Sequence, residues 1–186
     1  MAAVLDLEAE SLRLDSRKPY LELIDGIELR KMSPQMRHGQ IQVELAFLIR
    51  TWATGRRGVV VSEARFWLDI NPATATSLLP DVAYVSSERL VGLSKDDKQR
   101  PPFAPDLAIE IRSPGDRERN IARKVELYLD RGARLVLDVD PKREQIVAHD
   151  GTSTIIFAAG ETLEHEAFPG LKLDVEAVFA AGNPPA

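Results

Sequence analysis

Hydrophobic and polar residues alternate from residue 20 to residue 32, in the segment YLELIDGIELRKM. Alternation at every second position is typical of a strand with one buried face. Asp25 and Gly26 divide the segment. This dipeptide suits a two-residue hairpin turn, because both central residues of such a turn need a positive φ angle. The pattern therefore predicts two short strands joined at Asp25-Gly26.

A helical period follows, opening at Ser33-Pro34 and running to about Gly55. Serine suits the N-cap, and proline suits the first helical position. One predicted face carries Ile41, Leu45, Leu48 and Trp52, with His38 at its start and Glu44 at its edge. The opposite face carries Met36, Val43 and Phe47. Both faces of a helix that is apolar on two sides are expected to pack against other elements. This second stripe is therefore predicted to be buried or to contact a second copy of the chain.

The remaining chain is predicted to contain more strands and a second long helix. The predicted strands are residues 59–61 and 64–70, which are expected to pair, then 81–85, 107–112, 134–139, 145–148 and 153–157. The second helix spans about 117–131 and ends at Gly132 as a C′ glycine. Asn71–Leu79 and Leu93–Pro105 are predicted to be loops.

This order of hairpin, helix, strands, helix and strands indicates an α/β (mixed α+β) fold, with a central mixed β-sheet flanked by helices. Neither predicted loop resembles a linker between domains. We therefore expect one domain over residues 1–186, with a core at about 18–150 and C-terminal strands and a tail at 151–186.

Composition narrows the possible chemistry. The 186 residues include no cysteine, which excludes disulfides, thiolate catalysis and cysteine-bound metals. The three histidines are widely spaced, which argues against a histidine-based zinc site. The acidic start, MAAVLDLEAE, does not resemble a signal peptide, and no apolar run is long enough to span a membrane, so a cytoplasmic protein is expected. The net charge of −5 argues against nonspecific coating of nucleic acid.

Glu110 is unusual because it stands within the otherwise apolar strand LAIEIR. Alternation places Leu107, Ile109 and Ile111 on the core face, and Glu110 and Arg112 on the other. One interpretation is a Glu110–Arg112 ion pair on a solvated face. The other is a buried carboxylate that is paired or bound to a metal, because a lone buried charge is costly.

Two further positions extend this hypothesis. Asp81 follows Pro80 at the start of a predicted buried strand. Lys124 lies at the edge of the apolar stripe of the second long helix, beside Tyr128, and so leans toward the sheet. It is either a lysine that snorkels to water or an ammonium directed at Glu110 and Asp81.

The sequence around these residues is locally positive, although the whole chain is negative. The segment from Arg112 to Lys124 holds five basic and two acidic residues. Residues 113–116 form a predicted turn that leads into a helix N-terminus, a geometry that favours anions. An aspartate, a strand glutamate and a nearby cation together match a Mg²⁺-dependent phosphodiesterase, because hard carboxylate oxygens suit Mg²⁺.

The same residues resemble known motifs. Pro80-Asp81 followed by Glu110-Ile111-Arg112 resembles the PD-(D/E)XK nuclease superfamily. The wider set resembles its Uma-type putative restriction endonuclease family: YLELIDG at 20–26, MSP at 32–34, His38, PDV at 80–82, IEIRSPGD at 109–116, and Lys124, Tyr128 and Gly132. The resemblance implies a restriction-endonuclease-like fold and Mg²⁺ (or Mn²⁺) held by Asp81 and Glu110, with the backbone carbonyl of Ile111 as a further candidate ligand.

One position departs from the superfamily pattern. The lysine usually found two residues after the glutamate is Arg112 here, and arginine does not release its proton in proteins. Lys124 matches the position to which the family's lysine has moved. Arg112 and Lys124 therefore both remain candidates for the catalytic cation, and Arg112, Arg117 and Lys124 for binding phosphate.

Glu22 and His38 are second-tier candidates. Glu22 could reach the metal or be an exposed strand residue, and His38 could contact the site or be a satisfied core histidine. The function expected is a Mg²⁺-dependent DNA endonuclease that acts as a homodimer. The alternative is a weak or inactive module on the same fold that binds nucleic acid or protein. A Ser-His-Asp hydrolase built from Ser113, His38 and Asp116 is disfavoured, because no G-x-S-x-G motif is present.

Overall fold

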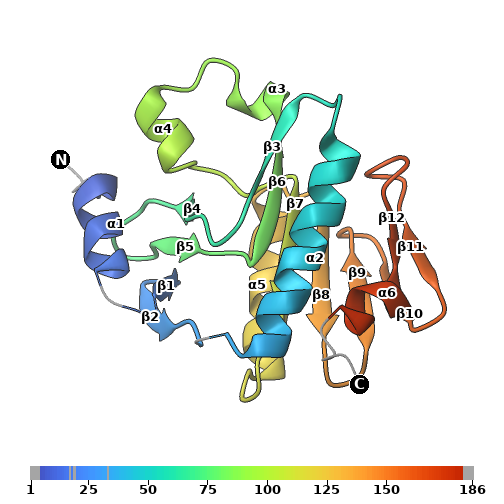
Figure 1. Cartoon of the computed structure of the whole chain (residues 1–186). Coiled ribbons are helices and arrows are strands. Elements are labelled where there is room, and N and C mark those ends of the chain that lie inside the picture. Colours follow the sequence, from blue (N-terminus) through green and yellow to red (C-terminus); the bar gives the residue numbers. More distant parts are fainter. Residues whose placement is uncertain (1–4, 17, 19, 33, 182–186) are drawn as a thin grey trace.

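Two sheets, one of six strands and one of four, organise the chain, which the computed structural model describes over residues 5–16, 18, 20–32 and 34–181 (Figure 1). The larger sheet has the strand order β10-β9-β8-β7-β6-β3. Its strands are β3 (Gly58–Val61), β6 (Val82–Ser86), β7 (Leu107–Ile111), β8 (Leu135–Asp140), β9 (Gln145–His149) and β10 (Thr154–Ala158). Only β7 and β8 run parallel, and α5 (Glu118–Asp130) connects them. The predicted mixed sheet flanked by helices is therefore confirmed.

Helices cover both faces of the larger sheet. On one face lies α2 (Met36–Ala53), which packs through Ile41, Leu45 and Ile49. On the other lies α5, which packs through Val125 and Tyr128. Every residue of β7 is consequently buried. The predicted alternation holds within that strand, because its isoleucines join the core beneath α2 while its glutamate faces α5.

The start of α2 differs from the prediction. Gln35 is the N-cap residue, Met36 is the first helical residue, and Pro34 precedes both. Ser33, predicted to cap this helix, lies outside the described residues. The end of α5 agrees with the prediction, since Gly132 has a φ angle of 93° just after the helix.

The four-stranded sheet contains the predicted hairpin and has the order β2-β1-β5-β4. Its strands are β1 (Leu21–Ile24), β2 (Ile27–Arg30), β4 (Phe66–Asp69) and β5 (Thr76–Leu78). The turn residues Asp25 and Gly26 have φ angles of 51° and 77°. A side chain at Gly26 would place its Cβ 2.9 Å from the carbonyl oxygen of Ala73, so glycine is needed here for space as well as for conformation.

The predicted pairing of residues 59–61 with 64–70 is wrong. β3 pairs with β6 in the larger sheet, whereas β4 pairs with β5 in the smaller one. Between them, Glu63 adopts a left-handed φ angle of 51° and donates its N–H to the carbonyl of Pro80, which redirects the chain from one sheet to the other. The strand β5 also lies within the segment predicted to be a loop.

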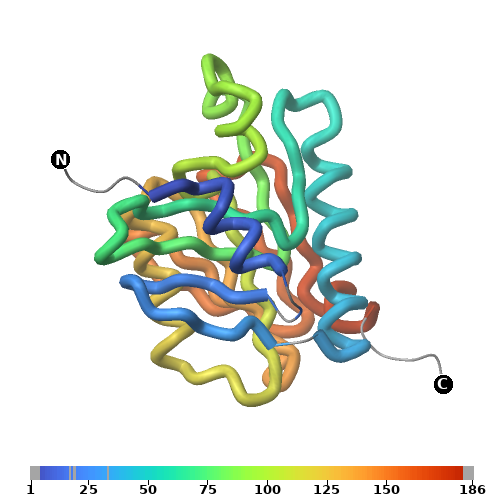
Figure 2. The backbone as a smooth tube through the Cα atoms, turned by 90° about the vertical axis from the view of Figure 1, so that its left-hand side faces the viewer, coloured from blue at the N-terminus to red at the C-terminus, as the bar shows by residue number. Residues whose placement is uncertain are grey.

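Several short elements complete the fold. Helix α1 (Leu7–Asp15) lies across the smaller sheet (Figure 2). The indole N–H of Trp67, on β4, donates a hydrogen bond to the hydroxyl of Ser11, on α1. A projecting arm carries α3 (Ser87–Leu90) and α4 (Lys95–Gln99). The C-terminal elements are β11 (Thr162–Glu164), β12 (Lys172–Asp174) and α6 (Val175–Ala180), and α6 packs on the α2 side of the larger sheet. Within the described residues, no helix combines the length and apolar character needed to cross a membrane.

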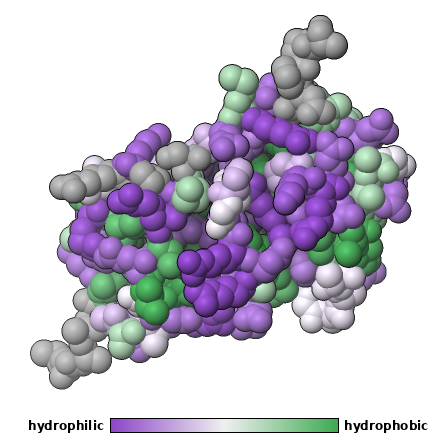
Figure 3. Space-filling model, turned by 90° about the horizontal axis from the view of Figure 1, so that it is seen from below, coloured by the Kyte–Doolittle hydropathy of each residue, from purple (hydrophilic) through white to green (hydrophobic). Residues whose placement is uncertain are grey.

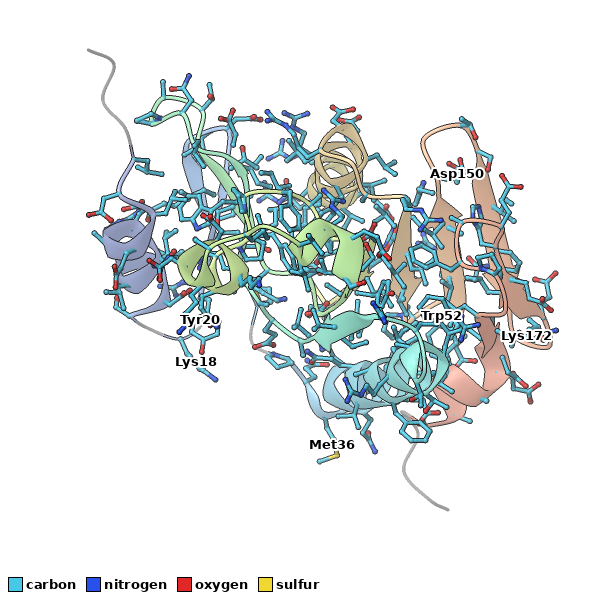
Figure 4. The ribbon with its side chains drawn as sticks, turned by 90° about the horizontal axis from the view of Figure 1, so that it is seen from above. Lys18, Tyr20, Met36, Trp52, Asp150 and Lys172 are labelled. Carbon is cyan, nitrogen blue, oxygen red and sulfur yellow. The ribbon has the colours of Figure 1, made fainter. Side chains whose placement is uncertain are left out.

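The second apolar stripe of α2 is not buried within the chain. Met36, Val43 and Phe47 are 82%, 69% and 62% exposed. Met36 projects away from the body of the molecule in Figure 4. Burial of this stripe therefore requires something other than this chain's own described core.

Candidate active site

A pocket lined by acidic and basic side chains lies at the end of the larger sheet where β7 ends and α2 begins. We call it the carboxylate pocket; its ionisable lining residues include Glu22, Lys31, His38, Asp81, Glu110 and Lys124. It lies between the two sheets, because Glu22 and Lys31 come from the hairpin of the smaller sheet. Figure 3 looks at this end of the molecule, where hydrophilic surface predominates.

Asp81 occupies the turn before β6 and is 1% exposed. Its Oδ2 accepts the backbone N–H of Ile111 at 2.7 Å. Its Oδ1 lies 2.8 Å from Nζ of Lys31, yet no hydrogen bond reaches that oxygen from the described residues. Burial opposes ionisation of Asp81, but the Lys31 ammonium and the His38 ring together hold the pKa of this carboxyl well below its ordinary value. Asp81 is therefore an ionised carboxylate, and its Oδ1 is ion-paired with Lys31.

Glu110 is buried between β7 and α5, and two residues of α5 contact its carboxylate. Its Oε1 accepts a hydrogen bond from the hydroxyl of Tyr128 at 2.8 Å, and Nζ of Lys124 donates to its Oε2 at 3.1 Å. Burial raises the pKa of Glu110 to about 7, despite the opposing effect of the Lys124 ammonium. The structure thus rejects the Glu110–Arg112 ion pair and brings Lys124 to Glu110.

Lys124 links Glu110 to Glu22. Its Nζ lies 2.7 Å from Oε2 of Glu22, and Oε1 of Glu22 accepts the backbone N–H of Leu79 at 3.0 Å. Glu22 is 2% exposed, so it is not an exposed strand residue. Burial alone would lower the pKa of Lys124, but Glu110 and Glu22 raise it above its ordinary value, so this ammonium stays charged. Lys124 is accordingly not a lysine that snorkels to water.

His38 reaches the same pocket from the first turn of α2. Its Nε2 lies 3.0 Å from the carbonyl oxygen of Ile111 and 3.4 Å from Oδ2 of Asp81. Desolvation works against the charged ring, but the hydrogen bond to Asp81 raises the pKa of His38 above its ordinary value. The ring therefore fixes the carboxylate relative to the end of β7. Ser113 donates its backbone N–H to Asp116 within a turn, as expected, and within the described residues no hydrogen bond joins its hydroxyl to His38.

Lys31 was not predicted from the sequence. It follows the last residue of β2, its side chain is 12% exposed, and Nζ also donates to the carbonyl of Leu79 at 2.5 Å. Desolvation opposes the charged form, but the surrounding carboxylates, Asp81 first, raise its pKa. In sequence it continues the exposed strand β2, so nothing in the local pattern distinguishes it from a surface lysine.

Comparisons with known proteins identify the family and the fold of the chain. Residues 7–176 match the family named Uma2 and described as "Putative restriction endonuclease". The chain belongs to the Uma2 family. It is also similar to a solved structure described as a putative nuclease belonging to DUF820 from Anabaena variabilis ATCC 29413, with 22% identity and a TM-score of 0.80, covering 96% of this chain and 99% of that chain. That likeness shows a shared fold. No protein with a curated description matches the chain.

In this Uma2 chain, Arg112 lies outside the carboxylate pocket. Its Nε and Nη2 donate to the two oxygens of Asp138 on β8, at 2.7 and 2.6 Å, and Nη1 donates to Glu118 at 2.6 Å. A bidentate arginine–carboxylate pair of this kind is strong and directional. Arg112 therefore fixes the turn after β7 to its neighbouring strand. Arg117 is exposed at the N-cap of α5 and lines neither the carboxylate pocket nor the cavity beside it.

The donor chemistry of the carboxylate pocket fits a hard divalent cation. Asp81 supplies a carboxylate whose Oδ1 is held by the Lys31 ion pair, and Glu110 and the Ile111 carbonyl supply further oxygens at the same end of β7. Mg²⁺ is commonly held by one or two carboxylates together with water and substrate phosphate. Among the described residues, no three His, Asp or Glu side chains are grouped as a complete metal cage. The arrangement thus suits an open Mg²⁺ site and not a closed structural one.

Proposed function

We propose that this Uma2 protein is a Mg²⁺- or Mn²⁺-dependent DNA endonuclease that hydrolyses phosphodiester bonds in the carboxylate pocket. The observation that supports this best is the convergence of Asp81, Glu110 and Lys124, from three separate elements, in one buried polar pocket. Family membership and the shared fold point to the same class of reaction.

Each residue has a definable task in this proposal. Asp81 and Glu110, with the Ile111 carbonyl, would hold the cation, and His38 would keep Asp81 and that carbonyl in register. A bound Mg²⁺ or Mn²⁺ supplies an acidified water and neutralises charge on the phosphate. Lys124 orients the attacking water or a phosphate oxygen, because its ammonium stays charged in the pocket. Glu22 keeps Lys124 in place through their 2.7 Å contact.

A wider cavity adjoins the pocket and shares His38, Ser113 and Asp116 with it. Arg37 and Lys142 line this cavity, and Lys142 makes no ion pair within the described chain. Backbone phosphates next to the scissile bond would lie here, because Lys and Arg contacts to phosphate position DNA without reading sequence. The strand to be cut would then run past the turn that Arg112 fixes.

Cleavage of plasmid DNA with Mg²⁺, Mn²⁺ or EDTA tests the proposal. The wild-type protein should nick or linearise DNA only with a divalent ion, and Glu110→Gln should lose this activity while its fold stays intact. Asp96→Asn provides a matched control, because this exposed residue of α4 loses the same charge outside the pocket. Equal cleavage by wild-type protein and Glu110→Gln would refute the proposal.

The alternative, a binding module without catalysis, has one observation in its favour. The ammonium groups of Lys31 and Lys124 already contact three of the pocket's four carboxylates, those of Asp81, Glu22 and Glu110. Their two positive charges offset part of the negative charge without a metal ion. Calorimetric titration with Mn²⁺ separates the two functions: an endonuclease should give binding heat that Glu110→Gln removes, and a binding module should give none.

We also propose that the protein acts on duplex DNA as a homodimer formed through the exposed stripe of α2. Two copies of α2 that cross antiparallel at Phe47 would place Glu44 of each copy opposite Arg50 of the other, and neither residue forms an ion pair within the described chain. The stripe is thus complementary to itself in both apolar surface and charge. Two-fold pairing is the commonest symmetry of soluble oligomers.

A further inference from the structure

A second pocket lies at the opposite end of α2 from the carboxylate pocket. Trp52, near the C-terminus of the helix, lines it, and His38, at the first turn, lines the other. Trp52 is fourteen positions after His38 in the helix, which corresponds to about 21 Å along the helix axis. Figure 4, viewed from above, shows Trp52 between α2 and the C-terminal strands.

Aromatic rings form the floor of this pocket. The rings of Trp52, Tyr84 and Phe168 contact one another edge to face, with centroid separations of 5.2 to 6.1 Å. Two guanidinium groups lie over these rings: the central carbon of Arg56 is 4.7 Å from the centroid of Trp52, and that of Arg134 is 5.0 Å from the centroid of Phe168. Stacking on a ring fixes a guanidinium plane and reduces the entropy lost when it binds a ligand.

The positive charge here is only partly balanced by the described residues that line the pocket. Arg56, Arg57 and Arg134 line the pocket, and Glu88 is the one carboxylate that lines it. Among the described residues, none of these three guanidinium groups forms an ion pair; Arg56 and Arg134 instead donate to backbone carbonyls. Arginines elsewhere do pair, for example Arg13 with Glu28 and Arg123 with Asp25.

This concentration is notable in a chain with 29 acidic and 24 basic residues, where carboxylates are in excess. Carbonyl oxygens orient a guanidinium group but leave its full charge available. An anion supplied from outside the protein would complete the arrangement. The paired N–H donors of a guanidinium group match the spacing of phosphate oxygens, so phosphate is the anion that fits best.

We propose that this arginine pocket, lined by Arg56, Arg57 and Arg134, binds a backbone phosphate of the nucleic-acid substrate away from the bond that is cut. The inference rests on the proposed function, because a nuclease substrate is the polyanion this protein would meet. A contact about 21 Å from the carboxylate pocket along α2 lies too far away to touch the scissile phosphate. It therefore adds affinity and orientation without chemistry.

The test measures DNA binding without cleavage. Affinity for a labelled duplex is determined by fluorescence anisotropy in EDTA at several salt concentrations, for wild-type protein and for Arg56→Gln/Arg134→Gln. Each lost phosphate contact should reduce the slope of log K against log salt by about 0.9, and affinity at low salt should fall about tenfold. Arg56→Lys/Arg134→Lys should restore only part of the affinity, because lysine does not form the bidentate contact.

Lys95→Gln/Lys98→Gln is the matched control, since it removes two exposed charges from α4, outside the pocket. A slope for Arg56→Gln/Arg134→Gln equal to that of this control would overturn the proposal, and so would wild-type binding that does not depend on salt. Asp81→Asn separates this test from that of the proposed function: it should abolish cleavage and leave the salt slope unchanged. On plasmid DNA, Arg56→Gln/Arg134→Gln should raise KM and leave kcat unchanged.

Discussion

The hydroxyl of Tyr128 donates a 2.8 Å hydrogen bond to Oε1 of Glu110, joining α5 to β7 inside the protein. Both side chains are buried. The phenylalanine variant would keep the ring packing and leave that carboxylate oxygen without its donor. We expect Tyr128→Phe to lower the free energy of unfolding by about 1–3 kcal/mol, the usual cost of an unsatisfied buried polar group, measured by urea denaturation. Tyr20→Phe, whose hydroxyl forms no hydrogen bond in the described structure, should change it by less than about 0.5 kcal/mol.

Stability should depend on pH through Glu110. Burial raises its pKa from 4.5 to about 7, so between these values the folded protein binds a proton that the unfolded chain releases. The free energy of unfolding that this group contributes therefore falls as pH rises from 4.5 to about 7. Glu110→Gln cannot titrate, so its stability should decline less over that range. Parallel wild-type and variant curves across this range would contradict the assignment.

Substitutions of Lys124 and of Arg112 should affect cleavage differently. Lys124→Met should reduce the cleavage rate by at least about 100-fold, because it removes the cation from the pocket. Arg112→Lys should keep most of the rate but lower the free energy of unfolding by about 1–3 kcal/mol, because a lysine cannot hold Asp138 with two hydrogen bonds. Single-turnover cleavage and urea denaturation of both variants give the two readouts. The reverse pattern would make Arg112 the catalytic cation.

Gly26 and Gly92 provide a matched pair. Both have a positive φ angle, 77° and 80°, but only at Gly26 would a Cβ meet backbone, at 2.9 Å from the oxygen of Ala73. Gly92→Ala should cost about 1 kcal/mol for conformation alone, and Gly26→Ala about 1–3 kcal/mol more, because the hairpin must shift. That shift should also displace Glu22 and slow cleavage. Equal thermal stability of the two variants would argue against this account.

The exposed face of α2 can be tested by a single substitution. Phe47→Glu should leave the free energy of unfolding of the isolated chain nearly unchanged, because the side chain is 62% exposed, but should dissociate the proposed homodimer. Light scattering after size-exclusion chromatography measures the mass of each form. Val91→Glu, at a position 78% exposed on the projecting arm, is the control. A wild-type protein that is monomeric at high concentration would refute the dimer.

Local patterns predicted the parts of the fold that local physics determines. Asp25-Gly26 defined a hairpin because both residues adopt positive φ angles, and alternation in β7 correctly separated Ile109 from Glu110. The pairing of β3 failed because its partner β6 lies more than twenty residues away, and alternation does not say which strand is the neighbour.

In the candidate site as well, local sequence patterns predicted some residues and missed others. Asp81, Glu110 and Lys124 were found because charged residues are unusual in apolar patterns. Lys31 was missed because it follows an exposed strand, where a lysine is ordinary. The partner of Arg112 is Asp138 on the adjacent parallel strand, a contact that depends on the crossover through α5 and not on nearby sequence.

The connection of β7 to β8 through α5 also affects the order in which parts of the pocket unfold. Lys124 and Glu110 are fourteen residues apart within this one continuous unit, whereas Glu22 reaches the same ammonium from the other sheet. Short loops close at little entropic cost, so this half of the pocket can persist when the hairpin detaches. Mild heat or denaturant should therefore inactivate the protein before its larger sheet melts, and cooling should restore activity as quickly as the hairpin docks again.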